Sequence, residues 1–169
     1  MAHEKIIAEL NKRRLAASQM GGEKKLFKRR ESGDLNAEER LTLLVDQDSF
    51  MELGLLGASG VFDKDVDKTP RDGKIVGFGQ INGRDVGVAI NDFTTKGAST
   101  SATNSKKMGY IRKTCTERGI PFIHVGESTG ARLPDAMGSK GMGQLLGNDV
   151  TQFTRTRETP WAAAALNSS

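Results

Sequence analysis

The chain has 169 residues, of which 36% are hydrophobic and 27% are charged, and its net charge is +4. This length supports one hydrophobic core, and this balance excludes a generally disordered chain. The single cysteine, Cys115, excludes an internal disulfide framework, and because only two histidines accompany it we expect no metal site. No apolar run reaches about 18 residues and no signal peptide begins the chain, so we expect no membrane span and a reducing, cytoplasmic setting.

Positive charge is concentrated near the start of the chain, where Lys and Arg recur from Lys12 to Arg30 with Glu23 as the only acid between them. Such a run can hold a nucleotide phosphate or an acidic partner, or it can be a solvated helical arm. Phe27 is the one aromatic residue among these cations, so stacking on single-stranded nucleic acid is poorly supported and we expect no nucleic-acid partner. We divide the chain into a basic helical arm, residues 1–35, and a main domain, residues 36–169.

Two helices are predicted before residue 46. The apolar positions of residues 3–20 share one side of a helix, and Gly21-Gly22 ends it, with a short basic link after it. Asn36, with Glu39 three positions later, has the pattern of a capping box and predicts a second helix. Residues 46–60 are expected to form a loop whose apolar side chains anchor it to the core.

From residue 72 the apolar pattern changes from a helical period to an extended one. The runs 75–81 and 84–90 flank Asn82-Gly83, and an Asn-Gly pair between two extended runs is the strongest short-range signal for a β-hairpin. Several strand positions are glycine, which indicates that another backbone or a ligand approaches closely there.

A strand–helix–strand unit is predicted after the hairpin turn. The strand 84–90 leads through a Gly/Ser-rich turn to a helix that Thr103 or Ser105 caps and Gly119 ends. A buried strand at residues 120–125 completes a right-handed parallel crossover. The helix is expected to turn three side chains inward: Met108, Ile111 and Cys115.

Two Gly-rich turns end neighbouring strands of this unit. Because the crossover is parallel, the turns 96–101 and 126–132 are expected to meet at the carboxyl edge of one sheet, where open α/β sheets bind their ligands. Beyond them we expect a Gly-rich segment that can turn into a helix, residues 133–147, a short helix near 149–157 and a last strand at 161–166.

Five segments carry a resemblance to a known family. They are A-E-E-R-L-T-L-L-V-D-Q-D-S-F-M-E-L at 37–53, D-G-K-I-V-G-F-G-Q-I-N-G-R-D-V at 72–86, N-D-F-T-T-K-G-A-S-T-S at 91–101, G-I-P-F-I at 119–123 and E-S-T-G-A-R-L at 127–133. In this order they resemble the N-terminal half of the carboxyltransferase component of biotin-dependent acyl-CoA carboxylases, a family of the crotonase-like superfamily. The resemblance covers residues 37–166.

The resemblance implies a crotonase-like α/β fold of ββα units, with a mixed, partly parallel sheet flanked by helices. It implies transfer of a carboxyl group between carboxybiotin and the α-carbon of an acyl-CoA. Biotin would be carried on a partner, so the implied partners are the biotin carrier and biotin carboxylase components, the second half of the carboxyltransferase, and further subunits of a homo- or hetero-oligomer. Such sites form where the first half of one subunit meets the second half of another.

In this superfamily two backbone N–H groups hold the thioester oxyanion. The resemblance places one of them in the turn 128–131, and we assign it to Gly130, with Thr129 or Ala131 as the alternatives. Thr129 stands where relatives commonly have Gly, and the turn can also need Gly130 only for a positive φ. The second donor would lie past Ser169, so we expect a truncated domain that is inactive alone.

Three residues of the first turn are assigned to CoA binding through backbone N–H groups at a helix N-terminus, unless they form an ordinary capping turn: Gly97, Ala98 and Ser99. Arg132 is assigned to a CoA phosphate or a substrate carboxylate, with an ion pair to Glu127 or Asp135 as the alternative. His124 is expected to be a hydrogen-bonded core histidine rather than an acid or base. Two other interpretations stay open, a decarboxylase subunit that runs the transfer from acyl-CoA to biotin, and a non-catalytic CoA-binding or assembly module.

Overall fold

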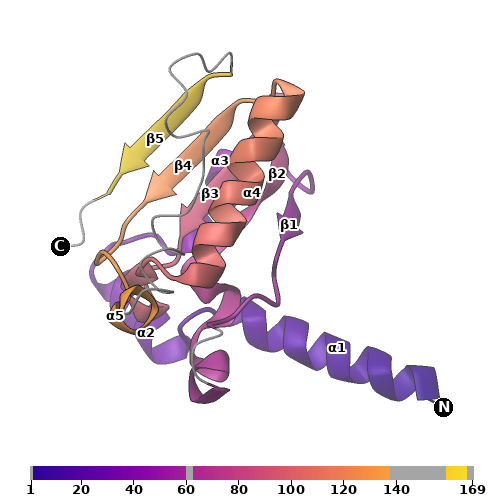
Figure 1. The fold of residues 1–169 in the computed structure, drawn as a ribbon, viewed down its shortest axis with the longest axis vertical. Coiled ribbons are helices and arrows are strands. Elements are labelled where there is room, and N and C mark those ends of the chain that lie inside the picture. The colour runs from indigo at the N-terminus through magenta and orange to yellow at the C-terminus, as the bar shows by residue number, and fades with distance from the viewer. Residues whose placement is uncertain (1, 60–62, 138–158, 167–169) are drawn as a thin grey trace.

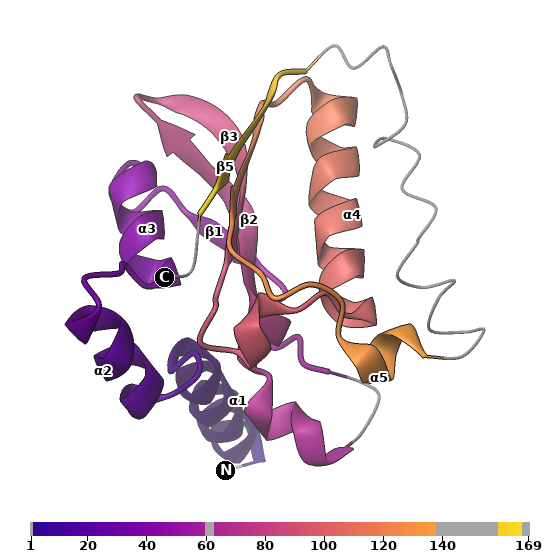
Figure 2. The ribbon, with the colours of Figure 1, turned by 90° about the vertical axis from the view of Figure 1, so that its left-hand side faces the viewer.

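The computed structural model describes residues 2–59, 63–137 and 159–166. Its centre is one five-stranded sheet of order β1-β2-β3-β4-β5, in which β1, β2 and β3 pair antiparallel and β3, β4 and β5 pair parallel. Helix α4 covers one face of the sheet, and α3 lies on the other with α2 beside it (Figures 1 and 2). This mixed, partly parallel sheet flanked by helices confirms the predicted fold class.

The elements follow one another in chain order. The helices are α1 (Ala2–Ser18), α2 (Glu23–Glu31), α3 (Ala37–Leu44), α4 (Ala102–Arg118) and α5 (Leu133–Ala136). The strands are β1 (Met51–Leu53), β2 (Lys74–Ile81), β3 (Arg84–Asn91), β4 (Phe122–Gly126) and β5 (Trp161–Ala165). Short 3-10 helices occupy η1 (Asp63–Lys68), η2 (Pro70–Gly73) and η3 (Lys96–Ala98).

The hairpin and the helix before it confirm two predictions from local sequence. Strands β2 and β3 pair up to Ile81 and Arg84, on either side of Asn82-Gly83. Asn36 and Glu39 form the reciprocal capping box at the start of α3. The two features are also joined, because the Asp46 carboxylate accepts hydrogen bonds from the turn N–H groups at 2.9 and 2.8 Å.

The expected loop at 46–60 is partly wrong, because Met51–Leu53 forms β1 along the edge of β2. A strand of three residues is too short for an alternating pattern to show in the sequence. The pairing depends on a glycine of β2, since a Cβ at Gly77 would lie 2.2 Å from the carbonyl oxygen of Met51. The sequence indicated a close approach at the strand glycines, but not which segment makes it.

Two further details differ from the prediction. The expected basic link after Gly22 is the helix α2, whose last turn carries Lys28, Arg29 and Arg30, where cations suit the helix dipole. Helix α4 begins at Ala102, and its cap is Ser101 rather than Thr103 or Ser105. The capping partner of Ser101 is Asn104, whereas the usual capping-box pattern has Glu or Gln at that position, so the pattern does not mark Ser101 as the cap.

The crossover from β3 through α4 to β4 is parallel, as predicted, with Gly87 opposite Phe122 and Ile90 opposite Val125. Side chains alternate between the two faces of the strands and form two cores. One core lies beneath α3 and includes Leu41, Ile75, Val86, Val88 and Ile90. The other lies beneath α4 and includes the predicted inward residues Met108, Ile111 and Cys115 with Val76, Ala89 and Phe122.

The C-terminal predictions are answered in part. The last strand is confirmed as β5, which pairs with β4 from Trp161 to Ala165. The first residues of the Gly-rich segment form the short helix α5. The rest of that segment and the predicted helix near 149–157 lie outside the described residues.

The close packing of β3 against α4 can be tested at Gly87. A Cβ at Gly87 would lie 2.2 Å from Cys115 Sγ, so we expect Gly87→Ala to lower the free energy of unfolding by about 1–3 kcal/mol through overpacking. Removing the sulfur with Cys115→Ala in the same chain should recover part of that loss. Urea unfolding followed by circular dichroism measures both.

Gly109 offers the matched control, because it lies within α4 and a Cβ there meets no atom of the described residues within 4 Å. We expect Gly109→Ala to raise stability by about 0.5–1 kcal/mol, since Ala loses less backbone entropy in a helix. Equal stability of the Gly87→Ala and Gly109→Ala variants would contradict the packing described for β3 and α4.

Candidate functional site

The two Gly-rich turns meet beyond the carboxyl ends of β3 and β4, as the sequence predicts. The Thr100 N–H donates to the Gly130 carbonyl at 2.7 Å, and the Arg132 N–H donates to the Thr100 carbonyl at 2.8 Å. The Thr129 N–H donates to the Gly97 carbonyl at 2.9 Å. Thr100 and Ala131 therefore form a parallel bridge that extends the sheet pairing into the turns.

The backbone of the first turn is built for this contact. Lys96, Gly97 and Ala98 have φ values of 50°, 60° and 49°, which is a strained conformation for the two residues that carry a Cβ. A Cβ at Gly97 would lie 2.6 Å from Thr129 Cγ2, so only glycine permits the turns to come this close. Thr129, at the position where the resemblance implies glycine, packs directly against Gly97.

The three candidate oxyanion donors have different partners. The Thr129 N–H is committed to the Gly97 carbonyl, and the Gly130 N–H donates to Ser128 Oγ at 3.2 Å. The Ala131 N–H has no acceptor among the described residues, and all three residues are exposed. Ser128 Oγ itself donates to the Ala98 carbonyl at 3.1 Å, so it ties the second turn to the first.

The N–H groups proposed to hold CoA are partly engaged within the first turn. The Ala98 N–H donates to Thr95 at 2.9 Å, and the Ser99 N–H donates to Lys96 at 3.2 Å. The N-terminus of α4 is also filled, because the Ala102 N–H donates to Asp135 Oδ1 at 3.0 Å. No local pattern marks this acid as a capping residue, since it lies 33 residues away.

Arg132 lies between the turns, but its guanidinium is bound inside the protein. Its Nη1 donates to Asp72 Oδ1 at 2.5 Å, and its Nε and Nη2 donate to Ser99 at 3.2 and 3.3 Å. This arrangement favours the ion-pair alternative over a phosphate contact. The partner is Asp72 rather than Glu127 or Asp135, and a partner 60 residues away leaves no local trace in the sequence.

Glu127, the residue that follows β4, is held by two arginines from the N-terminal helices. Arg29 donates to its two carboxylate oxygens at 2.8 and 2.9 Å, and Arg40 donates to Oε2 at 2.7 Å. Burial alone would raise the pKa of Glu127, but the hydrogen bonds and charges of Arg29 and Arg40 lower it below 4.5. A carboxylate held in this way is a poor base at neutral pH.

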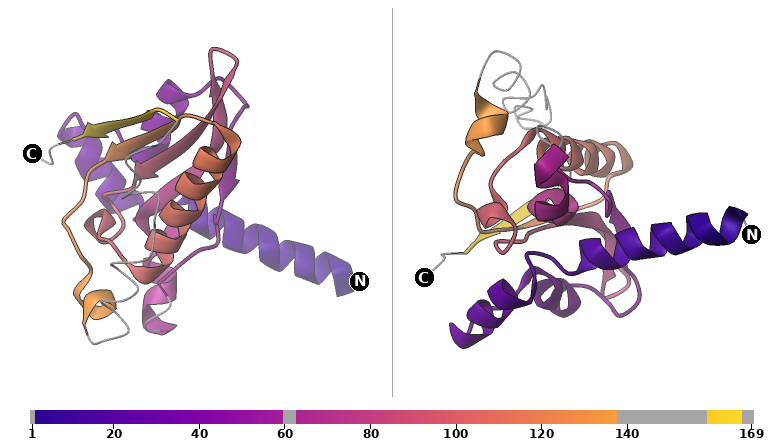
Figure 3. Two further views of the ribbon diagram at one scale, coloured as in Figure 1. Left: turned by 45° about the horizontal axis from the view of Figure 1, so that its top comes forward. Right: turned by 90° about the horizontal axis from the view of Figure 1, so that it is seen from below.

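The second half of the basic arm therefore packs as part of the main domain. Besides Arg29, the Gly21 N–H donates to Thr94 Oγ1 at 2.9 Å and Lys25 Nζ donates to the Thr94 carbonyl at 2.7 Å. Met20 is buried in the core beneath α3. Helix α1 instead extends away from the sheet (Figure 3).

His124 is hydrogen-bonded and neutral. Its Nε2 lies 3.3 Å from Asn91 Oδ1, and burial, with Lys74 and Arg112 nearby, lowers its pKa to about 4. Lys74 Nζ donates to the same oxygen at 2.8 Å, and burial lowers the pKa of Lys74 to about 8. This geometry agrees with a core histidine.

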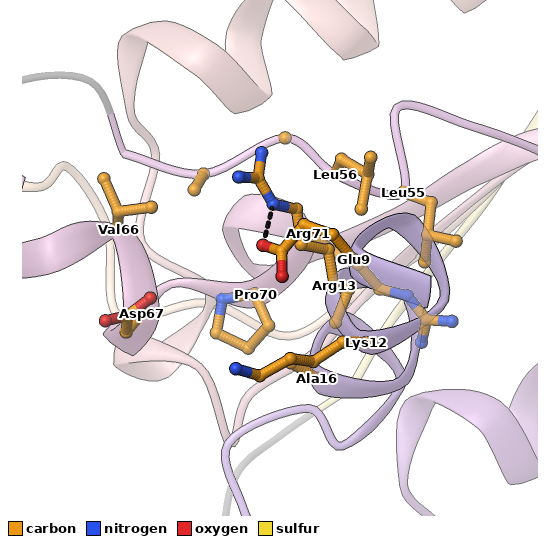
Figure 4. Close-up of a pocket in the computed structure, with 13 residues that line it drawn as sticks. Glu9, Lys12, Arg13, Ala16, Leu55, Leu56, Val66, Asp67, Pro70 and Arg71 are labelled. Carbon is orange, nitrogen blue, oxygen red and sulfur yellow. Dashed lines mark hydrogen bonds and ion pairs between the residues drawn. The ribbon is translucent and has the colours of Figure 1, made fainter. Parts of the chain in front are cut away.

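A cavity of about 600 Å³ lies between α1 and the segment 55–71 (Figure 4). None of the predicted site residues lines it. Its lining combines apolar and cationic side chains, including Lys12, Arg13, Leu55, Leu56, Pro70 and Arg71. Glu9 accepts a hydrogen bond from Arg13 Nε at 2.8 Å within it, and Arg71 forms ion pairs with Glu38 and Glu52, so two of its cations are already paired.

The described part of the chain was compared with the requirements of a metal site and of a membrane span. Within residues 2–59, 63–137 and 159–166, no three His, Cys, Asp or Glu side chains gather in a group that could hold a metal ion. None of the helices in those ranges has the length and apolar character needed to cross a membrane.

The fold is that of an α/β protein in which two Gly-rich turns pair beyond the carboxyl ends of parallel strands, and comparison with known proteins gives its family. The family "Carboxyl transferase domain" matches residues 28–155, so the chain belongs to that family. The propionyl-CoA carboxylase beta chain of Roseobacter denitrificans is 36% identical over 148 residues, which are 86% of this chain and 29% of that protein. The biotin-dependent long chain acyl-coenzyme A carboxylase beta4 subunit of Mycobacterium tuberculosis is 37% identical over 133 residues, 79% of this chain and 25% of that protein.

A solved structure gives the same result for the fold. The transcarboxylase 12S structure, with methylmalonyl-coenzyme A and methylmalonic acid bound, is 32% identical and superposes with a TM-score of 0.74. The match covers 83% of this chain and 28% of that one. It confirms the crotonase-like fold, and it shows that this chain spans less than a third of such a protein.

The ion pairs of Glu127 with Arg29 and Arg40 predict how the stability of the chain depends on pH. Because the pKa of Glu127 is lowered in the folded state, the contribution of Glu127 to the free energy of unfolding is fully present above pH 4.5 and is lost as the pH falls through the folded pKa. We expect Glu127→Gln to lower the free energy of unfolding at pH 7 by about 3 kcal/mol, since Arg29 and Arg40 lose their charged partner. Below pH 4.5 the free energy of unfolding of this variant should decrease less steeply than that of the unaltered chain.

Chemical denaturation at a series of pH values measures this effect. The matched control is Glu117→Gln, because Glu117 is exposed and its one ion pair is weak: its Oε1 lies 3.7 Å from Nζ of the exposed Lys113. That change should cost at most about 0.5 kcal/mol. If the two variants had the same stability at pH 7, Glu127 would not hold the arm to the main domain.

Proposed function

We propose that this chain forms the acyl-CoA side of a biotin-dependent carboxyltransferase. The thioester oxygen of the acyl-CoA lies against the turn 128–131, where a backbone N–H stabilises the enolate that forms when the α-carbon exchanges a carboxyl group with carboxybiotin. The observation that supports this most directly is the contact between the two turns at the ligand edge of the sheet. Transfer from acyl-CoA to biotin passes through the same enolate, so one site serves both directions.

Gly130 and Ala131 are better candidates for the donor than Thr129. A donor must be free to turn to an oxyanion, and the Thr129 N–H is bound to Gly97 at 2.9 Å. The Gly130 N–H makes only a long bond to a side-chain hydroxyl, and the Ala131 N–H has no acceptor within the described residues. We therefore propose the N–H of Ala131 as the main donor, with that of Gly130 beside it.

In this proposal Gly97, Ala98 and Ser99 shape the turn on which CoA lies, because Ala98 and Ser99 are buried and present little surface to a ligand. The Ala98 and Ser99 N–H groups are engaged inside their own turn, which leaves the Gly97 N–H as the backbone donor of the three that has no acceptor among the described residues. Biotin would reach the site on a partner, and the second oxyanion donor would come from the other half of the carboxyltransferase. A reducing, cytoplasmic compartment suits the buried free thiol of Cys115.

The first experiment is an acyl-CoA titration of the 169-residue chain by calorimetry. We expect binding without carboxyl transfer, because the proposed chemistry needs the second donor and carboxybiotin. A chain that lacks residues 1–16 should bind equally well, since Gly21, Lys25 and Arg29, which fasten the arm, are retained. If neither chain bound acyl-CoA, the proposed role would be wrong.

The second experiment removes the proposed donor from a complete carboxyltransferase, made by joining this chain to the second half. Ala131→Pro deletes that N–H without removing any hydrogen bond between described residues, and Ala131 has no positive φ. We expect kcat to fall about 10²–10³-fold with little change in CoA affinity, as for the loss of one oxyanion donor. Gly109→Ala, in α4, should leave turnover unchanged. Equal turnover by the Ala131→Pro enzyme would exclude this N–H as a donor.

A further inference from the structure

Asp72 is a fully buried carboxylate that lies between the two turns. It lies within the 3-10 helix η2 before β2, its exposed fraction is 0%, and its φ of 47° is unusual for a residue with a side chain. Its Oδ1 accepts the bond from Arg132, and its Oδ2 accepts the hydroxyl of Ser101, the N-cap of α4. One side chain therefore contacts the last residue of the first turn, Ser101, and the last residue of the second turn, Arg132.

The surrounding contacts close this link into a network. Asn104 Nδ2 donates to the Asp72 carbonyl at 3.0 Å and to the Ser99 carbonyl at 2.9 Å. Arg132 donates to Ser99 through Nε and Nη2. The Asn104 side chain is fully buried and that of Arg132 is 10% exposed, so little water competes for these bonds. The network joins the start of β2, the first turn, the start of α4 and the second turn.

We propose that Asp72 is a positioning residue that fixes the backbone of the second turn through Arg132. A carboxylate with no exposure must keep its ion pair, because an unpaired buried charge is strongly unfavourable. A guanidinium that donates through three nitrogens has a fixed orientation. The Arg132 N–H is bound to Thr100, so Ala131, one residue earlier, is held against the first turn. This inference rests on the proposed function only where it concerns acyl-CoA.

In the alternative hypothesis Arg132 binds a phosphate of CoA. The two hypotheses predict opposite changes in acyl-CoA affinity for Asp72→Asn. If Arg132 binds phosphate, removal of the Asp72 charge frees it and acyl-CoA should bind more tightly. If Asp72 positions the turn through Arg132, the same change should weaken binding, because the turn loses its preferred arrangement before the ligand arrives. Arg132→Lys separates them again, since lysine keeps the charge for a phosphate but not the three-nitrogen contact.

The experiment uses the 169-residue chain and two measurements. Amide hydrogen exchange followed by NMR should show the hydrogen-bonded N–H groups of Thr129 and Arg132 exchanging about tenfold faster in Asp72→Asn and in Arg132→Lys, while those of the β2–β3 hairpin are unchanged. Calorimetry with acyl-CoA should show a Kd at least about fivefold higher for both variants. Arg132→Lys retains a cation beside Asp72, so it keeps the test decisive if Asp72→Asn unfolds.

Asp46→Asn is the matched control. Asp46 also accepts two bonds from a turn, but at the far hairpin tip, so its loss should speed exchange at Asn82 and Gly83 and leave residues 129 and 132 unchanged. Unchanged exchange at residues 129 and 132 in Arg132→Lys, or tighter acyl-CoA binding by Asp72→Asn, would overturn the positioning role. If the unaltered chain binds no acyl-CoA, the proposed function fails, and the exchange measurement still decides the role of Asp72.

Discussion

The backbone ladder between the two turns is the interaction on which the rest of the structure depends. Three N–H···O=C bonds, from Thr100, Thr129 and Arg132, continue the parallel pairing of β3 and β4 past the point where both strands end. Such a ladder requires two parallel neighbours joined by a crossover, and it requires Gly97 at the contact, because any Cβ would meet Thr129. The N–H groups that face outward are then fixed by backbone geometry and need no titrating side chain.

Two buried carboxylates secure the ladder from opposite sides. Asp72 holds Arg132 at the end of the second turn, and Glu127, near the start of that turn, holds Arg29 and Arg40. The Glu127 carbonyl also accepts a bond from Asn91 at the end of β3, so the start of the second turn is tied to β3 as well as to α2 and α3. The run of cations in the arm thus includes one that is buried and paired, while the others stay near solvent as the sequence suggested.

Local patterns predicted the elements, and contacts between distant residues decided the details of the site. The Asn82-Gly83 hairpin, the Asn36 cap and the parallel crossover could be predicted because each strand, helix and turn in them has its own signal in neighbouring residues. The short strand β1 could not, because its existence depends on β2. The partner of Arg132 could not either, since ion pairs between residues 60 apart leave no periodicity or spacing to recognise.

The ionisable groups near the turns explain why the chain would contribute geometry rather than a proton acceptor. His124 is neutral at pH 7 but bonded to Asn91, with its pKa lowered to about 4 by burial. Glu127 is ionised but bound by two arginines, which lowers its pKa and its basicity. Asp72 has its Oδ1 and Oδ2 bound by Arg132 and Ser101. A base for enolate formation would then come with the carboxybiotin, and fixed backbone donors are what the proposed reaction asks of this half of the site.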